Sequence, residues 1–169
     1  MSQLIWRPAK RSDRAVLQHF TCTVPLRKYQ HNQPRHPKEW ELEVQSGIRT
    51  LRPPVGSDQI MLIGEDATGI GAVTLSAEQA EGPSVVKLQA VAIATYLRGQ
   101  GGGYADAALQ AALEAAGARA SAAGLNEFLA VGWIDSRNKP SKLMCERAGF
   151  SYLRTMPSGL EEWGVTVEL

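Results

Sequence analysis

One segment near the middle of the chain constrains the fold more than any other. An extended apolar stretch ends at Ile93, glycines occupy positions 99 and 101–103, and an alanine-rich helical pattern begins at once near Tyr104. Glycines let backbone N–H groups converge on an anion, and a helix N-terminus adds partial positive charge. The segment is therefore typical of a phosphate cradle, with a merely flexible turn as the alternative.

Two familiar phosphate loops do not fit this segment. No Lys-Ser or Lys-Thr pair follows the glycines, as a Walker loop requires. The segment lies in mid-chain and no parallel strand pairing precedes it, so it is also a poor match to the dinucleotide-binding fingerprint.

Apolar periodicity, glycines and prolines predict the other elements. Strands are expected over residues 4–7, 59–64, 70–76, 85–94, 128–134, 152–156 and 163–169. Helices are expected after Ser12-Asp13 and over residues 38–50, 103–123 and 139–148, and residues 21–37 are expected to be irregular. This order predicts an α/β protein with a mixed sheet and helices on both of its faces.

The composition is that of an ordinary globular protein. The chain has 169 residues, 44% of them hydrophobic and 21% charged, which excludes a disordered chain and a coiled coil and predicts a single domain over residues 1–169. Cys22 and Cys145 lie far apart, which argues against a disulfide scaffold or a zinc site. With no signal-like apolar run at the start and no transmembrane stretch, we expect a cytoplasmic protein without a membrane partner.

Two motifs, at the right separation, match those of one known family. Arg98-x-x-Gly101-x-Gly103 resembles the pyrophosphate-binding pattern R/Q-x-x-G-x-G/A of the GNAT superfamily of acyl-CoA N-acyltransferases. The segment that begins at Asn138 resembles that superfamily's second pattern, N-x-x-A-x-x-x-Y-E-K-x-G-F. The resemblance is close over residues 59–155 and loose before them. It implies the GNAT fold, a mostly antiparallel central sheet that splays open between its fourth and fifth strands, with helices on both faces.

The resemblance also implies which residues hold acetyl-CoA, the expected co-substrate. The strand edge at Val91, Ala92 and Ile93 would pair with the pantetheine arm, and the Ile93 N–H would polarise the thioester carbonyl. Asn138 would bond the pantetheine or cap its own helix, two roles that are compatible. The pyrophosphate would be surrounded by the Arg98 side chain and the backbone N–H groups of Gly99, Gln100, Gly101, Gly102, Gly103 and Tyr104.

Both proton-transfer positions depart from the family pattern. Where many members carry a basic glutamate on the strand before the glycines, this chain has Lys87 and Gln89. Where a tyrosine usually serves as general acid, it has Cys145, whose thiol could reprotonate the coenzyme or simply be a small buried side chain. Tyr104 and Tyr152 are weaker substitutes for that acid.

The general base and the acceptor pocket are less well defined. Asp135, at the expected mouth of the cleft, is the first candidate for the base, and Glu39 and Glu43 come next. For each of them a surface acid without a catalytic role is the favoured alternative. Water can serve instead if the amine arrives neutral. In the family, the stretch that holds Tyr29, His36 and Trp40 often shapes the acceptor pocket, so these side chains could form an aromatic wall. Packing explains Trp40 equally well.

A metal site is not expected. His31 and His36 lie in a proline-broken segment, and no cysteine or carboxylate cluster accompanies them.

Three functions are compatible with these features. The first is transfer of an acetyl group from acetyl-CoA to a primary amine by direct attack, with a small-molecule acceptor favoured over a protein. The second is an acyl-CoA-binding module without turnover. The third, a toxin-like acetyltransferase of aminoacyl-tRNA, rests only on the ten basic against five acidic residues in positions 1–60. A net charge of +1 argues against a dedicated nucleic-acid binder, and a homodimer is left open.

Overall fold

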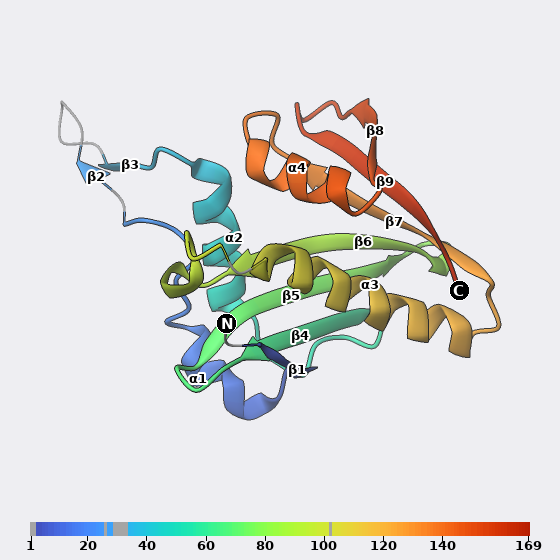
Figure 1. Cartoon of the computed structure of the whole chain (residues 1–169), viewed down its shortest axis with the longest axis horizontal. Helices are drawn as coiled ribbons and strands as arrows, with labels where there is room; N and C mark the ends of the chain where they lie inside the picture. Colours follow the sequence, from blue (N-terminus) through green and yellow to red (C-terminus); the bar gives the residue numbers. More distant parts are fainter. Residues whose placement is uncertain (1–2, 26, 29–33, 102) are drawn as a thin grey trace.

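The structure is a computed structural model that describes residues 3–25, 27–28, 34–101 and 103–169 (Figure 1). Its main feature is a seven-stranded sheet in the order β1-β4-β5-β6-β7-β9-β8. The strands of this sheet are β1 (Ile5–Pro8), β4 (Gln59–Glu65), β5 (Ile70–Gln79), β6 (Gly82–Ile93), β7 (Glu127–Ile134), β8 (Ser151–Thr155) and β9 (Glu161–Glu168). All neighbouring strands pair antiparallel except β6 and β7, which pair parallel. The predicted mixed sheet is confirmed.

The helices cover both faces of this sheet. A 3-10 turn (Arg11–Asp13) leads into α1 (Arg14–Leu17); α2 (Glu39–Thr50) and α1 share one core cluster with β4 and β5. The longer α3 (Tyr104–Ala122) and α4 (Lys139–Arg147) share another with β7 and β9. In Figure 1, α3 and α4 lie together in front of the sheet.

The ends of α3 and the start of α4 follow from local sequence. Ten alanines and two leucines make α3 a strong helix former, and Gly103 (φ 65°) precedes it as the N-cap. Gly124 (φ 79°) takes the left-handed conformation that ends such helices. Asn138 caps α4, because its side chain accepts a hydrogen bond from the Ser141 N–H at 3.3 Å.

The sheet opens between β6 and β7, its fourth and fifth strands in spatial order. The parallel ladder contains four pairs and ends at Leu88 and Gly132. Beyond this rung β6 continues to Ile93 and β7 to Ile134 without pairing to each other, and Figure 1 shows the two halves of the sheet diverging toward α2 and α4. The predicted splay is confirmed.

Three details differ from the sequence-based expectation. The segment over residues 21–37, expected to be irregular, contains a small antiparallel pair, β2 (Arg27–Lys28) with β3 (Pro34–Arg35), too short to leave a periodic pattern. The strand expected over residues 85–94 begins at Gly82, because it forms a tight hairpin with β5. The first helix is a single turn in which Val16 is exposed.

Among the described residues, no helix is both long and apolar enough to cross a membrane.

Candidate active site

A cleft of about 1030 Å³ lies where the sheet splays. Its walls come from α2, the exposed end of β6, the glycine loop, the start of α3, the end of β7 and α4. The cleft therefore joins the two segments that the sequence singled out, the glycine cluster and the motif that begins at Asn138.

The edge of β6 offers free backbone groups to this cleft. The Ala94 N–H donates to the Gly71 carbonyl at 2.8 Å, and Ala72 lies opposite Ile93 in the same antiparallel register. Because hydrogen-bonded and non-hydrogen-bonded pairs alternate along such a ladder, the N–H and C=O groups of Ile93 and Val91 point away from β5. They face the opening, where β7 no longer pairs with β6. An extended ligand can add to this edge as a strand does.

The glycine loop follows directly from this strand. Gly99, Gly101 and Gly103 have φ values of 74°, 66° and 65°, in the region that strains other residues. A Cβ atom at any of the three would meet no other atom within 4 Å, so conformation and not crowding requires glycine. Gly102 lies outside the described residues.

The N-terminus of α3 adds electrostatic support at the end of this loop. The Ala107 N–H donates to the Gly103 carbonyl as the first intrahelical bond, so the preceding N–H groups have no acceptor within the helix. These groups and the helix dipole favour an anion such as a diphosphate.

Compared by sequence, the chain matches no protein-family model and no curated protein. Compared by structure, it is similar over nearly its whole length to solved acetyltransferases. The PaiA N-acetyltransferase from Thermoplasma acidophilum, in complex with coenzyme A, superimposes with a TM-score of 0.69 at 13% identity, covering 99% of this chain and 100% of that one. An acetyltransferase of the GNAT family from Streptococcus pneumoniae gives 0.62 at 14% identity, covering 98% and 99%. A variant of the SpeG spermidine N-acetyltransferase from Vibrio cholerae gives 0.62 at 15% identity, covering 97% and 94%.

The chain has the GNAT fold. The fold that the two motifs implied is thus confirmed from the backbone, although sequence identity to these structures is low. In this GNAT fold, β6 and β7 are the two strands that splay, and the glycine loop connects β6 to α3.

Arg98, expected beside a pyrophosphate, instead reaches across the cleft to α2. Its Nη1 lies 3.1 Å from Oε1 of Glu41, and its side chain is 41% exposed. The side chain of Gln100 donates to the Tyr96 carbonyl, and Tyr104 lines the cleft at the start of α3. The side chains of Arg98 and Gln100 are thus bonded to other parts of the chain.

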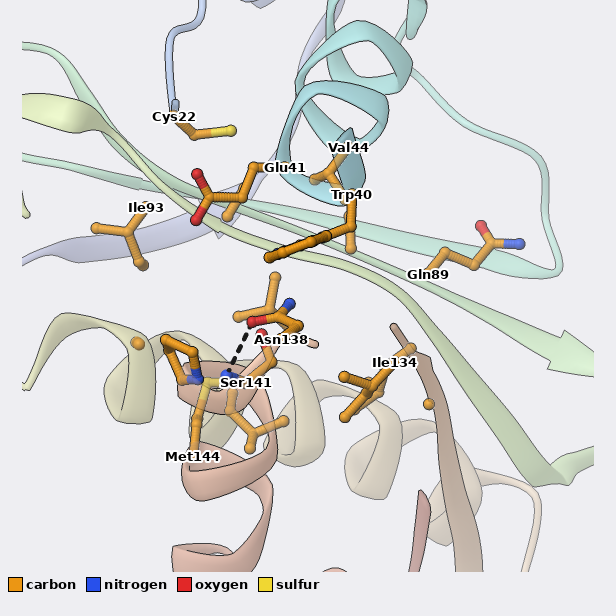
Figure 2. Close-up of a pocket in the computed structure, with 18 of the residues that line it drawn as sticks. Cys22, Trp40, Glu41, Val44, Gln89, Ile93, Ile134, Asn138, Ser141 and Met144 are labelled. Atoms are coloured by element: carbon orange, nitrogen blue, oxygen red, sulfur yellow. Dashed lines mark hydrogen bonds between the residues drawn. The ribbon is translucent and has the colours of Figure 1, made fainter. Parts of the chain in front are cut away.

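Glu41 is the cleft carboxylate that the sequence analysis missed. Its side chain is 13% exposed, against 70% for Glu39, and its Oε2 accepts a hydrogen bond from the Thr23 hydroxyl at 2.7 Å. Burial raises the pKa of Glu41, but the Thr23 hydrogen bond and the Arg98 charge outweigh it and hold this pKa below the usual value. Figure 2 shows the Glu41 carboxylate between Cys22 and Trp40.

A sequence signal for Glu41 did exist. Glu41, Gln45 and Ile48 recur at the spacing of one helix face, and Gln45 and Ile48 are the two buried residues of α2. The apolar residues Trp40, Val44 and Ile48 form an adjacent stripe that shares Ile48 with this face, so hydrophobic periodicity alone does not single out Glu41.

Asp135 lies at the cleft mouth as predicted, but its carboxylate is fully engaged. The Arg137 side chain donates two hydrogen bonds of 2.9 Å to it, from Nε and Nη2. The Arg137 backbone N–H donates a third at 2.9 Å. This hydrogen-bonding lowers the pKa of Asp135 to about 2. A carboxylate held so firmly in its ionised form is a weak base at neutral pH, so the geometry does not favour Asp135 in that role.

Cys145 lies in the α4 wall and is 5% exposed, within the core cluster beneath α3. Burial raises the pKa of its thiol to about 11, which weakens it as a proton donor. Of the two interpretations left open by the sequence, packing is the one that the surroundings favour. Tyr152 is on β8, half exposed, with its hydroxyl bonded to Thr155.

Trp40 of α2, expected in the acceptor pocket, lines the cleft. Its ring lies across the cleft from Asn138 in Figure 2, and the Arg137 guanidinium lies 4.9 Å from the ring centroid. His36 is not part of this wall: it is buried, accepts the Lys38 N–H at 2.9 Å and contacts the Val24 carbonyl at 2.7 Å.

Tyr29 and His31 lie outside the described residues. In the part of the chain that is described, no three His, Cys, Asp or Glu side chains gather as a metal site would require.

Proposed function

We propose that this protein transfers an acetyl group from acetyl-CoA to a primary amine by direct attack within a ternary complex. The observation that carries the proposal is the open edge of β6, whose free N–H groups at Val91 and Ile93 lead straight into the glycine loop. An extended acyl thioester with a diphosphate at its far end matches this arrangement in shape and in charge.

Each part of the site then has a chemical role. The N–H groups of the loop and of the first turn of α3 bind the diphosphate, and the edge of β6 pairs with the pantetheine arm. The arm runs back along β6 toward the closed end of the opening. The Ile93 N–H stabilises the negative charge that develops on the thioester oxygen. Asn138 faces the same channel from the cap of α4.

Proton transfer relies on solvent in this proposal. Asp135 and Glu41 are both ion-paired in the cleft, and Cys145 is a buried thiol with a raised pKa. The amine therefore enters in its neutral form and attacks the carbonyl carbon. The C–S bond breaks, the coenzyme leaves as a thiolate, and water accepts the ammonium proton and reprotonates the sulfur.

The test is an acceptor screen in which acetyl-CoA is incubated with primary amines and free thiol release is followed with a chromogenic disulfide. Mass spectrometry of the amine must show the addition of one acetyl group. Thiol release that does not depend on the amine would contradict direct transfer.

The ion pairing of Glu41, Asp106 and Asp135 in the cleft also favours a second function, an acyl-CoA-binding module without turnover. Calorimetric binding of acetyl-CoA combined with no acetylated product across the screen would establish this alternative.

A further inference from the structure

Lys87 differs from the other cations of the cleft in having no carboxylate partner. The partnered cations and their N···O distances are Lys38 to Glu41 at 3.6 Å, Arg98 to Glu41 at 3.1 Å, Arg137 to Asp135 at 2.9 Å and Arg147 to Asp106 at 2.6 Å. Every Asp and Glu of the chain lies within the described residues, and none of their oxygens is within 4.0 Å of the Lys87 Nζ.

An aromatic ring holds the Lys87 ammonium in place. Its Nζ lies 3.1 Å from the centroid of the Trp133 ring, a cation–π contact that favours the charged form. Burial lowers the pKa of Lys87 below its usual value, and the negative charge of Glu162 offsets this lowering only in part. The Glu162 carboxylate is already engaged by the Trp133 Nε1–H at 3.0 Å and by Arg154 at 2.7 Å. Lys87 is thus fixed in position while its N–H groups lack an anionic acceptor.

The place of Lys87 on β6 puts it on the acceptor side of the cleft. It stands at the last rungs of the β6–β7 ladder, the closed end of the opening, one residue before Leu88. Val86 and Leu88 pack into the core beneath α3, and successive strand residues point to opposite faces. Lys87 therefore points to the face covered by α2, opposite the α3 face. Trp133 is 42% exposed and lines the same cleft as Lys87.

We infer that Lys87, held over Trp133, binds an anionic group of the acceptor, so that the substrate is an amine that also carries a carboxylate or phosphate. This inference rests on the proposed function and narrows it. A half-buried ammonium attracts such an anion strongly, because solvent screens it only in part. The same charge repels a polycation. Spermidine, the substrate named for one structural neighbour, should therefore be a poor acceptor here.

The experiment compares amines in matched pairs on purified full-length protein. Glycine, β-alanine and 4-aminobutyrate are each paired with their amides, and ethanolamine phosphate is paired with ethanolamine, which separates carboxylate from phosphate recognition. Spermidine completes the panel. We expect kcat/KM for at least one acid to exceed that of its neutral partner about 10-fold or more, as expected when a site that pairs a charge meets an analogue without it.

Variants of Lys87 test whether this residue causes the preference for the acid over its neutral partner. Lys87→Met keeps the length of the side chain and removes the charge; it should raise KM for the acid about 10-fold or more, while kcat/KM for the neutral amine stays within about 3-fold. Lys87→Arg should retain most of the preference, and Lys10→Met, an exposed lysine outside the cleft, serves as the control. Melting curves of all the variants confirm folding.

Several outcomes would overturn the inference. One is a wild-type preference for the neutral amine or for spermidine. Another is a fall in kcat of Lys87→Met that is equal on every amine, which would make Lys87 a proton-transfer group. If no amine is acetylated, the proposed function fails, and calorimetry with coenzyme A present still tests the site: the acids must bind wild type and not Lys87→Met.

Discussion

Gly103 combines a left-handed backbone conformation with a position at the N-terminus of α3, where the helix dipole favours negative charge. It occupies the N-cap of α3, and space is open around its α-carbon. Asn and Asp tolerate that conformation better than other side chains and both cap helices, so the two differ there chiefly in charge.

We therefore expect Gly103→Asp to weaken acetyl-CoA binding about 100-fold or more, because a carboxylate would occupy the proposed diphosphate site. Gly103→Asn should weaken it much less. Isothermal titration calorimetry measures both affinities. Equal affinities of the Asp and Asn variants would place the diphosphate elsewhere.

Cys145 tests whether a residue at a family's catalytic position must be catalytic. Because the thiol is buried with a raised pKa, Cys145→Ala should leave kcat within about 3-fold of wild type. The small cavity should lower the free energy of unfolding by about 1–2 kcal/mol. Steady-state kinetics and urea unfolding measure the two effects. A loss of about 100-fold in kcat with unchanged stability would restore the thiol as the general acid.

At the scale of single elements, β6 makes the sharpest prediction. The amides of Val91 and Ile93 face the opening, whereas the Ala92 amide bonds to Val73 of β5 by the alternation of the ladder. Coenzyme A should slow hydrogen exchange at Val91 and Ile93 about 10-fold or more beyond the change at Ala92, which is the internal control. NMR resolves the three amides. Equal slowing at all three would mean that the ligand does not pair with this edge.

The elements that sequence reasoning placed well are those whose ends have local causes. The expected helix over residues 103–123 is observed as Tyr104–Ala122, because glycines bound it on both sides. The expected strand over residues 128–134 is observed as Glu127–Ile134, because its apolar run is continuous.

The parts of the site that sequence reasoning missed depend on contacts across the fold. The Thr23 hydroxyl and the Arg98 guanidinium, which bond to the Glu41 carboxylate in the cleft, are distant from Glu41 in sequence. The lack of a carboxylate partner for Lys87 appears only once every acid has been placed. The capture of Asp135 by Arg137, two residues away, was by contrast a local pattern open to prediction.

At the scale of the whole molecule, acid stability follows from carboxylates whose pKa values are lowered in the folded state. They are Asp13, Glu41, Glu65, Asp66, Asp135 and Glu162. A depressed folded pKa contributes stability above the unfolded pKa, and this contribution is lost as pH falls through the folded value. The melting temperature should therefore fall as pH decreases from about 5 to about 2.

Asp135→Asn should remove part of this fall, since the pKa of Asp135 drops from 3.8 to about 2 on folding. Between pH 4 and about 2, the melting temperature of the variant should fall less steeply with decreasing pH than that of wild type. Glu168→Gln, at an exposed position, is the control. Parallel pH profiles for wild type and Asp135→Asn would show that the ion pair with Arg137 is too well hydrated to matter.

The two walls of the cleft, which meet at the four-pair ladder between β6 and β7, come from separate parts of the sequence. Every cleft-lining residue up to Leu109 precedes the exposed turn at Gly124, and every one from Gly132 onward follows it. A backbone cut at this turn would yield two pieces, each with one wall of the cleft, that can meet again through the packing of α3 on Phe128. In the proposed function, acetyl-CoA contacts both walls and would hold the pieces together. A split form of this protein would then report the coenzyme's concentration through its own reassembly.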